Sequence, residues 1–365
     1  MRAPPAPRPP PVIGRAVPLA TASARAGARG QASRNRRPAR RPAASAAAAP
    51  LPTITGPRPF DAGVPIDRST YAWRGHTVAY ARAGPPTAPP VVLLHGFGAS
   101  AGHWRKLVKP LTDAGHAVYA PDLLGFGASD KPALEYSTPL WRDLVLDFVR
   151  DVVQADGAGP GAVLVGNSLG SLVALLAAAA APTGSIAAVA LVNVAGGMNN
   201  KAASDDWRIA LATPIFALID FLLSIPPVAR ALFDSFRKPD TLQGVLESVY
   251  GNKDAVDAAL VDLVAAPAGD EGALAAFVSI ISGDPGPRPE TAVEAITCPL
   301  LFVWGDPDPF TPVDGPVGQW ARGLATSRPD TAFALLPGVG HCPQDDDPAA
   351  VAAVMVPWLA RVRGW

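Results

Sequence analysis

Acidic residues and lysine are absent from the first 60 residues of this 365-residue chain. The same stretch holds 11 arginines, 16 alanines and 13 prolines, so it buries too little apolar surface to offset the entropy lost on ordering. It has no apolar run of the secretory type, and an Arg-rich, acid-free composition is typical of organellar transit peptides. We therefore predict that residues 1–60 are a disordered transit peptide, and their proline content favours the chloroplast over the mitochondrion. The alternative is a disordered basic tail of a cytosolic protein.

Cysteine, basic charge and long apolar runs are scarce in the rest of the chain. The two cysteines, Cys298 and Cys342, cannot form a disulfide framework and suit a reducing compartment. Of the 31 basic residues, 20 lie beyond residue 60, against all 31 acidic ones, and an acidic body without a basic cluster argues against nucleic acid as a partner. No window reaches the ~18 uncharged apolar residues that a membrane-spanning helix needs. About 300 residues remain, which is enough for a large buried core.

Six short apolar runs alternate with helical patterns. Such runs are typical of strands buried on both faces of a parallel sheet. They cover residues 91–94, 117–120, 162–165, 186–194, 300–304 and 332–336, and the clearest helical patterns cover 141–153, 169–181 and 348–362. The alternation predicts an α/β fold whose parallel strands are joined by right-handed crossovers.

Residues 198–290 break this alternation. Their pattern predicts several helices, including 207–223 and 228–236, before a Gly/Pro-rich stretch at 282–287. A helical insertion between two strands of such a sheet is a candidate cap. We therefore predict four regions, namely the transit peptide 1–60, a first core part 61–197, the cap 198–290 and a second core part 291–365.

The segment Gly166-Asn167-Ser168-Leu169-Gly170 matches the pattern G-x-S-x-G. It follows a predicted strand and opens a predicted helix, which is the context that this motif requires. Small residues are needed because the turn is tight and forces the serine backbone toward strained φ and ψ angles. The turn would present the Ser168 hydroxyl as a nucleophile and leave the N–H of Leu169 at a helix N-terminus, where it can bind an oxyanion.

A second oxyanion donor is expected in His95-Gly96-Phe97-Gly98, which follows the first of the six predicted strands. We expect the N–H of Phe97 to be this donor, and losing one such donor typically costs ~2.7–4 kcal/mol of transition-state stabilisation. His95 itself is expected to brace the loop rather than to carry a proton.

The general base must follow the nucleophile in this arrangement. Of the 5 histidines only His341 lies after Ser168, in a glycine-rich loop between a predicted strand and the last predicted helix. The acid that orients it should follow the fifth predicted strand, where Asp306 and Asp308 are both placed to accept the Nδ1–H. Spacing alone leaves this choice open.

Two further features near His341 have structural explanations. Cys342 is expected to be a small buried residue, as is Cys298, because Ser168 already occupies the nucleophile position. Residues 345–347 are three aspartates just before the last predicted helix, where the helix dipole stabilises carboxylates. We found no further ligands for a metal, and we expect neither a metal nor a cofactor.

The motif order and spacing identify residues 71–365 as a member of the α/β-hydrolase superfamily. The resemblance implies a mostly parallel central sheet flanked by helices, with a helical cap inserted after the sixth strand. The superfamily pattern W-G-x-x-D corresponds to residues 304–308 and implies that Asp308 is the acid. Superfamily members that act on haloalkanes or epoxides use a carboxylate nucleophile, so Ser168 argues against those activities.

A narrower resemblance is to the chlorophyll dephytylase and pheophytinase family of plastid hydrolases. The similar segments lie in both core and cap, at residues 122–132, 165–171, 193–201, 206–208, 250–253, 271–274 and 338–343. One departure is Val194-Ala195, where the family leads us to expect Cys-Ala. The resemblance implies hydrolysis of the phytyl ester of chlorophyll or pheophytin by the triad Ser168–Asp308–His341. It also implies a place in the chloroplast, in the stroma or peripheral to the thylakoid membrane.

Two alternatives remain. The chain could be a plastid lipase or general carboxylesterase of the same fold, or a non-catalytic ligand receptor, which the intact triad disfavours. A large apolar ester would suit the apolar surface of the predicted helix 207–223, although most of that surface is expected to pack on the core. Phe221 and Leu222 are our candidates for lining the substrate pocket or touching the thylakoid.

Overall fold

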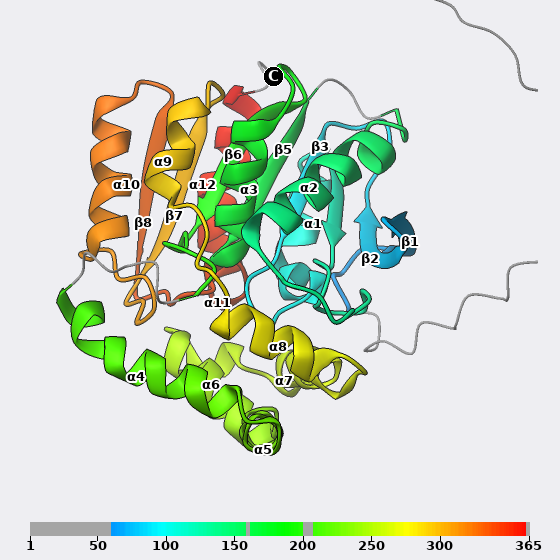
Figure 1. Cartoon of the computed structure of the whole chain (residues 1–365). Helices are drawn as coiled ribbons and strands as arrows, with labels where there is room; N and C mark the ends of the chain where they lie inside the picture. The colour runs from blue at the N-terminus through cyan, green and yellow to red at the C-terminus, as the bar shows by residue number, and fades with distance from the viewer. Residues whose placement is uncertain (1–59, 158–160, 200–206, 363–365) are drawn as a thin grey trace, which may run out of the picture. The chain divides into compact units, whose positions relative to one another are not determined.

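A computed structural model describes residues 60–157, 161–199 and 207–362. Its centre is one eight-stranded sheet in the order β1-β2-β4-β3-β5-β6-β7-β8 (Figure 1). The strands are β1 (Asp67–Trp73), β2 (His76–Ala83), β3 (Pro90–Leu94), β4 (Ala117–Pro121), β5 (Ala162–Asn167), β6 (Ile186–Val192), β7 (Leu300–Asp306) and β8 (Thr331–Pro337). From β4 to β8 all neighbours are parallel, whereas β2 pairs antiparallel with β1 and β4. The predicted mostly parallel sheet is therefore confirmed.

The six predicted apolar runs are β3 to β8. β1 and β2 were not predicted, because they form a hairpin at the sheet edge that includes charged residues and has no continuous buried run. In β1 only Trp73 is buried, and β2 mixes buried and half-buried side chains. β6 ends two residues earlier than its apolar run, since the backbone of Asn193 turns to a φ of 42°.

Helices cover both faces of the sheet and create two cores (Figure 1). On one face pack α2 (Thr138–Phe148), α3 (Leu169–Ala180), α9 (Pro289–Ala292) and α10 (Pro316–Ser327), and on the other α1 (Arg105–Asp113) and α12 (Pro348–Val362). The chain continues from α2 as one π-helical turn, Val149–Val153, so the predicted helix 141–153 is confirmed in two pieces. Short 3₁₀ turns cover Ala101–Trp104, Lys253–Ala255, Pro267–Gly269 and Val293–Ala295.

The insertion between β6 and β7 is helical, which confirms a cap after the sixth strand. It contains α4 (Trp207–Leu223), α5 (Pro226–Phe236), α6 (Pro239–Val249), α7 (Ala258–Ala265) and α8 (Ala273–Ser282). Among the described residues no single helix has the length and apolarity to cross a membrane. Two sharply bent helix pairs meet that test together, namely Pro214–Leu223 with Pro226–Phe236 and Ala258–Gly269 with Ala273–Ser282.

The predicted transit peptide lies outside the described residues except for its last member. Phe60 is buried in the core on the α1 and α12 face, where one of its ring carbons lies close to Gly102. The folded chain therefore includes at least one residue of the predicted peptide.

Candidate active site

Ser168 lies on a strained turn between β5 and α3. Its φ of 53° and ψ of −117° are unusual for a residue with a side chain, and the backbone N–H is held by the carbonyl oxygen of Val192 at 2.9 Å. A Cβ atom at Gly166 would overlap the backbone of Gly170, and one at Gly170 would overlap the backbone of Leu94. The glycines are therefore required by close approach, as the sequence pattern predicts.

The loop after β3 lies beside this turn. A Cβ atom placed on Gly96 would be 3.4 Å from the Cβ of Ser168, so the backbone of the loop passes next to the serine. The N–H of Phe97 follows in this loop, and Leu169 is the first residue of α3, whose N–H has no carbonyl four residues back within the helix. The two predicted oxyanion donors, Phe97 in this loop and Leu169 at the start of α3, thus lie on the two segments next to Ser168.

His95 holds this loop in place. Its Nε2 accepts a hydrogen bond from the N–H of Leu123 at 3.0 Å, which leaves Nδ1–H to donate to the carbonyl oxygen of Gly96 at 2.8 Å. Burial lowers the pKa of His95, so the ring is neutral at physiological pH. The expected bracing role agrees with these contacts.

His341 and Asp308 form a buried pair, although they lie in loops after different strands. Nδ1 of His341 is 2.7 Å from Oδ2 of Asp308. Asp306, the alternative that spacing left open, is exposed at the end of β7. With Nδ1 occupied by the carboxylate, Nε2 is the ring nitrogen left to act on a substrate.

Asp308 is held by groups that the sequence did not point to. Oδ2 also accepts from the side-chain amide of Asn193 at 2.6 Å, and Oδ1 accepts from the N–H groups of Phe310 at 2.8 Å and Thr311 at 3.0 Å. Burial raises the pKa of Asp308, but the hydrogen bonds from His341 and Thr311 outweigh it and lower the pKa to about 2. The carboxylate therefore stays ionised over the whole physiological range.

Asn193 is the main residue that sequence reasoning missed. It is fully buried, and its Oδ1 accepts the N–H of Gly305 at 2.9 Å while its amide contacts Asp308. The asparagine therefore joins the ends of β6 and β7. An asparagine at the end of an apolar run is a signal that could have found it, because asparagine tolerates a positive φ.

The loop that carries His341 is tied to the nucleophile turn and to the cap. The side chain of Asn167, next to Ser168, donates to the carbonyl oxygen of His341 at 3.0 Å. The N–H of His341 in turn donates to the carbonyl oxygen of Val249, the last residue of α6, at 2.7 Å. The structure thus brings the predicted base and nucleophile segments together beneath the cap.

The three aspartates at 345–347 have different roles. The prediction that the dipole of the last helix explains all three is therefore corrected. Only Asp347 caps α12, by accepting the N–H of Ala350 at 2.9 Å. Asp346, in the short helix α11 (Pro343–Asp346), accepts the N–H groups of Gly340, Gly251 and Asn252 at 2.6, 2.8 and 2.9 Å. It therefore fastens the cap to the histidine loop.

Asp345 is the centre of a second buried contact between core and cap. It accepts from Nε of Arg105 at 2.9 Å, lies 3.3 Å from Nζ of Lys106 and accepts from the hydroxyl of Tyr250 at 3.2 Å. Arg105 also pairs with Asp257 of the cap at 2.9 Å. The cap is thus held by charge pairs as well as by apolar packing.

The remaining predicted residues are placed less centrally. Cys342 is buried and burial raises the pKa of its thiol well above the usual range, whereas Cys298 is only half-buried. On α4, Phe221 is 62% exposed and Leu222 half-buried. Phe221 therefore faces outward in this structure, which suits the expected surface contact better than a pocket wall.

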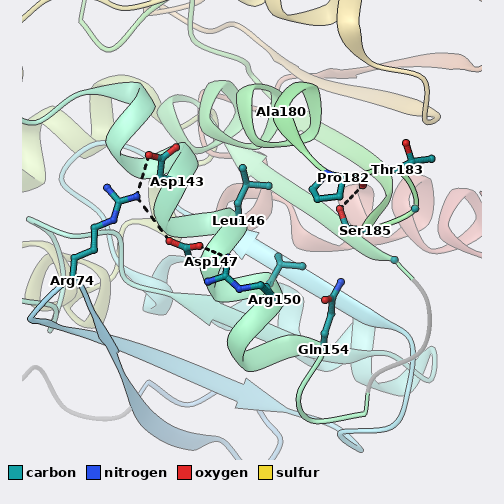
Figure 2. Close-up of a pocket in the computed structure, with 13 residues that line it drawn as sticks. Arg74, Asp143, Leu146, Asp147, Arg150, Gln154, Ala180, Pro182, Thr183 and Ser185 are labelled. Atoms are coloured by element: carbon teal, nitrogen blue, oxygen red, sulfur yellow. Dashed lines mark hydrogen bonds and ion pairs between the residues drawn. The ribbon is translucent and has the colours of Figure 1, made fainter. Parts of the chain in front are cut away.

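A hollow of about 870 Å³ lies elsewhere, between α2 and the loop that enters β6 (Figure 2). Its charged side chains are paired, with Arg74 3.2 Å from Asp143 and Arg150 2.6 Å from Asp147. In this sheet Ser168 follows the carboxyl end of β5, while the hollow lies at the amino end of β6, so it is not part of the triad site.

A family model described as "Alpha/beta hydrolase family" matches residues 91–354. This chain belongs to the alpha/beta hydrolase family. The matched range contains Ser168, Asp308 and His341.

Two curated relatives of this alpha/beta hydrolase differ in activity. A haloalkane dehalogenase of Mycolicibacterium paratuberculosis is 39% identical over 117 residues, which are 32% of this chain and 36% of that protein. The chloroplast pheophytinase of Arabidopsis thaliana is 26% identical over an alignment of 342 positions, which covers 80% of this chain and 66% of that protein. The matches thus span about one third and just under two thirds of these relatives.

Solved structures agree on the fold. An epoxide hydrolase, CorEH, aligns with a TM-score of 0.65 at 18% identity and covers 82% of this hydrolase and 100% of its own chain. A membrane phospholipase A aligns with a TM-score of 0.61 at 24% identity over 82% of this chain and 87% of its own. At such identities the likeness concerns the fold alone.

Proposed function

We propose that this alpha/beta hydrolase is a serine ester hydrolase with the triad Ser168, Asp308 and His341. The observation that carries the proposal is the 2.7 Å contact between His341 and Asp308, in a loop tied by Asn167 to the strained serine turn. A histidine whose Nδ1 is held by an ionised carboxylate is a general base at Nε2.

The reaction proceeds in two steps. Oγ of Ser168 attacks the ester carbonyl while its proton passes to Nε2 of His341, and the N–H groups of Phe97 and Leu169 bind the oxyanion. The bond to the alcohol oxygen breaks as Nε2 returns the proton to it, which leaves an acyl-serine. His341 then takes a proton from water, whose oxygen attacks the acyl carbonyl carbon. The bond to Oγ of Ser168 breaks as Nε2 returns that proton to Oγ, which releases the acid and restores the enzyme.

The serine favours ester over haloalkane hydrolysis, although haloalkane dehalogenases are among the relatives. A serine that displaced a halide would become an alkyl ether, which a histidine and water cannot cleave under mild conditions. A serine that attacks an ester becomes an acyl ester, which they can hydrolyse. The hydroxyl nucleophile is therefore matched to acyl transfer.

The proposed substrate is the phytyl ester of a chlorophyll-type pigment, and the proposed location is the chloroplast, with peripheral contact to the thylakoid. Support comes from the motif resemblance in core and cap and from the alignment with the Arabidopsis pheophytinase over 80% of the chain. The apolar outer surface of α4 is consistent with a substrate that resides in a membrane.

Two measurements test the proposal. Wild-type protein should be labelled by a fluorophosphonate, and Ser168→Ala should not, because only an activated serine reacts. Incubation with chlorophyll a, pheophytin a and p-nitrophenyl acetate should release phytol from at least one pigment. Labelling without phytol release would leave a general carboxylesterase or lipase, and absence of labelling would exclude a serine hydrolase.

A further inference from the structure

Two exposed aromatic rings border the proposed nucleophile and base. Phe97 is 37% exposed and follows Gly96, the residue whose backbone passes beside Ser168. Phe310 is 54% exposed, and its ring lies edge-on to the imidazole of His341 with 5.3 Å between the centroids. Large apolar side chains left in water next to a reactive centre mark a surface that binds apolar ligands.

The ring of Phe97 begins an aromatic wall that leads into the cap. Its centroid is 6.1 Å from that of Phe277 on α8. Phe277 in turn contacts Phe233 at 5.1 Å and Phe236 at 5.9 Å, both on α5. Phe233 is buried and packs against Phe277, so we call the three accessible rings Phe97, Phe277 and Phe236 the aromatic wall.

Phe310 lies on the other flank and is anchored at its backbone. Its N–H donates to Oδ1 of Asp308 at 2.8 Å, so the position of the ring is linked to the acid–base pair. Because Asp308 occupies Nδ1 of His341, the proton that the leaving alcohol receives must come from Nε2. The alcohol half of an ester must therefore lie on the His341 side during this step.

The acyl half is placed by a different constraint. Its carbonyl oxygen must reach the N–H groups of Phe97 and Leu169 when the tetrahedral intermediate forms. A chain attached to that carbonyl carbon begins beside this loop, whose exposed apolar side chain is Phe97, the first ring of the aromatic wall. The two halves of the ester thus have separate apolar neighbours.

We infer that the aromatic wall binds the hydrocarbon of the acyl half, and that Phe310 binds the hydrocarbon of the alcohol half. The site then selects esters that are apolar on both sides of the ester bond. This assignment rests on the proposed function, and it names Phe277 and Phe310 as specificity-determining residues.

The experiment varies each half of the ester separately. One series is p-nitrophenyl esters from acetate to laurate, and the other is acetate esters of alcohols from ethanol to dodecanol, followed by acid release. Phe277→Ala should lower kcat/KM for laurate relative to acetate roughly 10- to 100-fold and leave the alcohol series unchanged. Phe310→Ala should lower kcat/KM for dodecyl acetate relative to ethyl acetate by a similar factor and leave the p-nitrophenyl series unchanged.

Two further variants control for damage to the fold. Leu232→Ala removes an exposed side chain from the same helix as Phe236, at a residue 44% exposed, and should leave both length profiles unchanged. Phe277→Leu keeps an apolar side chain and should retain part of the preference for long acyl chains.

The outcomes separate the two proposals. The assignment is overturned if both Phe277 variants lower kcat/KM for p-nitrophenyl acetate and p-nitrophenyl laurate equally. It is also overturned if Phe277→Ala changes the length profile of the alcohol series, or if Phe310→Ala changes that of the acyl series. If Ser168-dependent hydrolysis persists with both length profiles intact, this assignment alone fails. If wild type hydrolyses no ester, or Ser168→Ala is as active as wild type, the proposed function fails first.

Discussion

The side-chain amide of Asn193 donates a 2.6 Å hydrogen bond to Oδ2 of Asp308, the same oxygen that contacts His341. Asn193 follows β6 and Asp308 follows β7, so one side chain aligns the loops of two neighbouring strands. Asp308 is thereby oriented before any substrate binds, which is how a charged group stabilises a transition state without reorganisation.

Replacing Asn193 with alanine should lower kcat with a small effect on KM. A hydrogen bond to a charged group contributes about 1.5–3 kcal/mol, so we expect roughly a 10- to 100-fold fall in kcat for p-nitrophenyl acetate. Asn193→Asp should be worse, because a second carboxylate beside Asp308 raises the pKa of the pair. Gln319→Ala, on the exposed face of α10, is the control, and equal kcat values for all three variants would contradict the role.

Acid stability should depend on Asp308. A carboxyl group whose pKa falls from 3.8 to about 2 on folding contributes about 2 kcal/mol to the free energy of unfolding at neutral pH. Since the folded pKa is the lower one, this contribution is complete above about pH 5 and is largely lost as the pH falls toward 2. In denaturant titrations over that range, the free energy of unfolding of wild type should fall by about 2 kcal/mol more than that of Asp308→Asn. Equal falls in the two proteins would refute the lowered pKa of Asp308.

Asp346 should be needed to hold the cap against the loop of His341. Its carboxylate accepts three backbone N–H groups, and an asparagine in its place would turn an amide N–H₂ toward some of these donors. We expect Asp346→Asn to lower the free energy of unfolding by about 2–3 kcal/mol and to speed hydrogen exchange at Gly340 and Gly251. Asp347→Asn, one residue further on, is the matched control, because asparagine caps a helix as well as aspartate. Equal exchange rates in both variants would argue against the fastening.

The exposed surface of α4 should mediate binding to lipid. Ile215, Leu218 and Phe221 are 59, 56 and 62% exposed, and Asp220 is the one charged residue among 214–223. We expect wild type to co-sediment with neutral phosphatidylcholine vesicles. The double variant Phe221→Ser, Leu222→Ser should lose most of this binding and still hydrolyse p-nitrophenyl acetate. Leu335→Ser on β8 is the control, and unchanged sedimentation of the double variant would exclude α4 as the contact.

Elements with strong local signals could be predicted from the sequence. The runs that became β3 to β8 are apolar on both faces, and residues 207–223 form α4 over the predicted span, since their pattern needs no distant partner to be recognised. β1 and β2 escaped prediction because an edge hairpin with one solvated face mixes charged and apolar residues. The serine turn was found because its glycines are demanded by local geometry.

The supporting contacts of the site could not be predicted in this way. Asn193 and Asp308 are 115 positions apart, and Arg105 and Asp345 are 240 apart. A single asparagine or aspartate has the same local signal whether it caps a turn or holds a catalytic carboxylate. Which partner it meets depends on the strand order.

By itself, the sequence determined the alternation of strands and helices, the strained serine turn and the order of nucleophile, acid and histidine. These features are local, because they follow from apolar periodicity and from the small residues that a tight turn requires. Only the tertiary structure decided that Asn193 holds Asp308 and that Asp346 fastens the cap, and it placed Asp308, the acid that the superfamily pattern implied, against His341. The reason is physical, since strands far apart in the chain lie side by side in the sheet and bring the loops at their carboxyl ends within hydrogen-bonding distance.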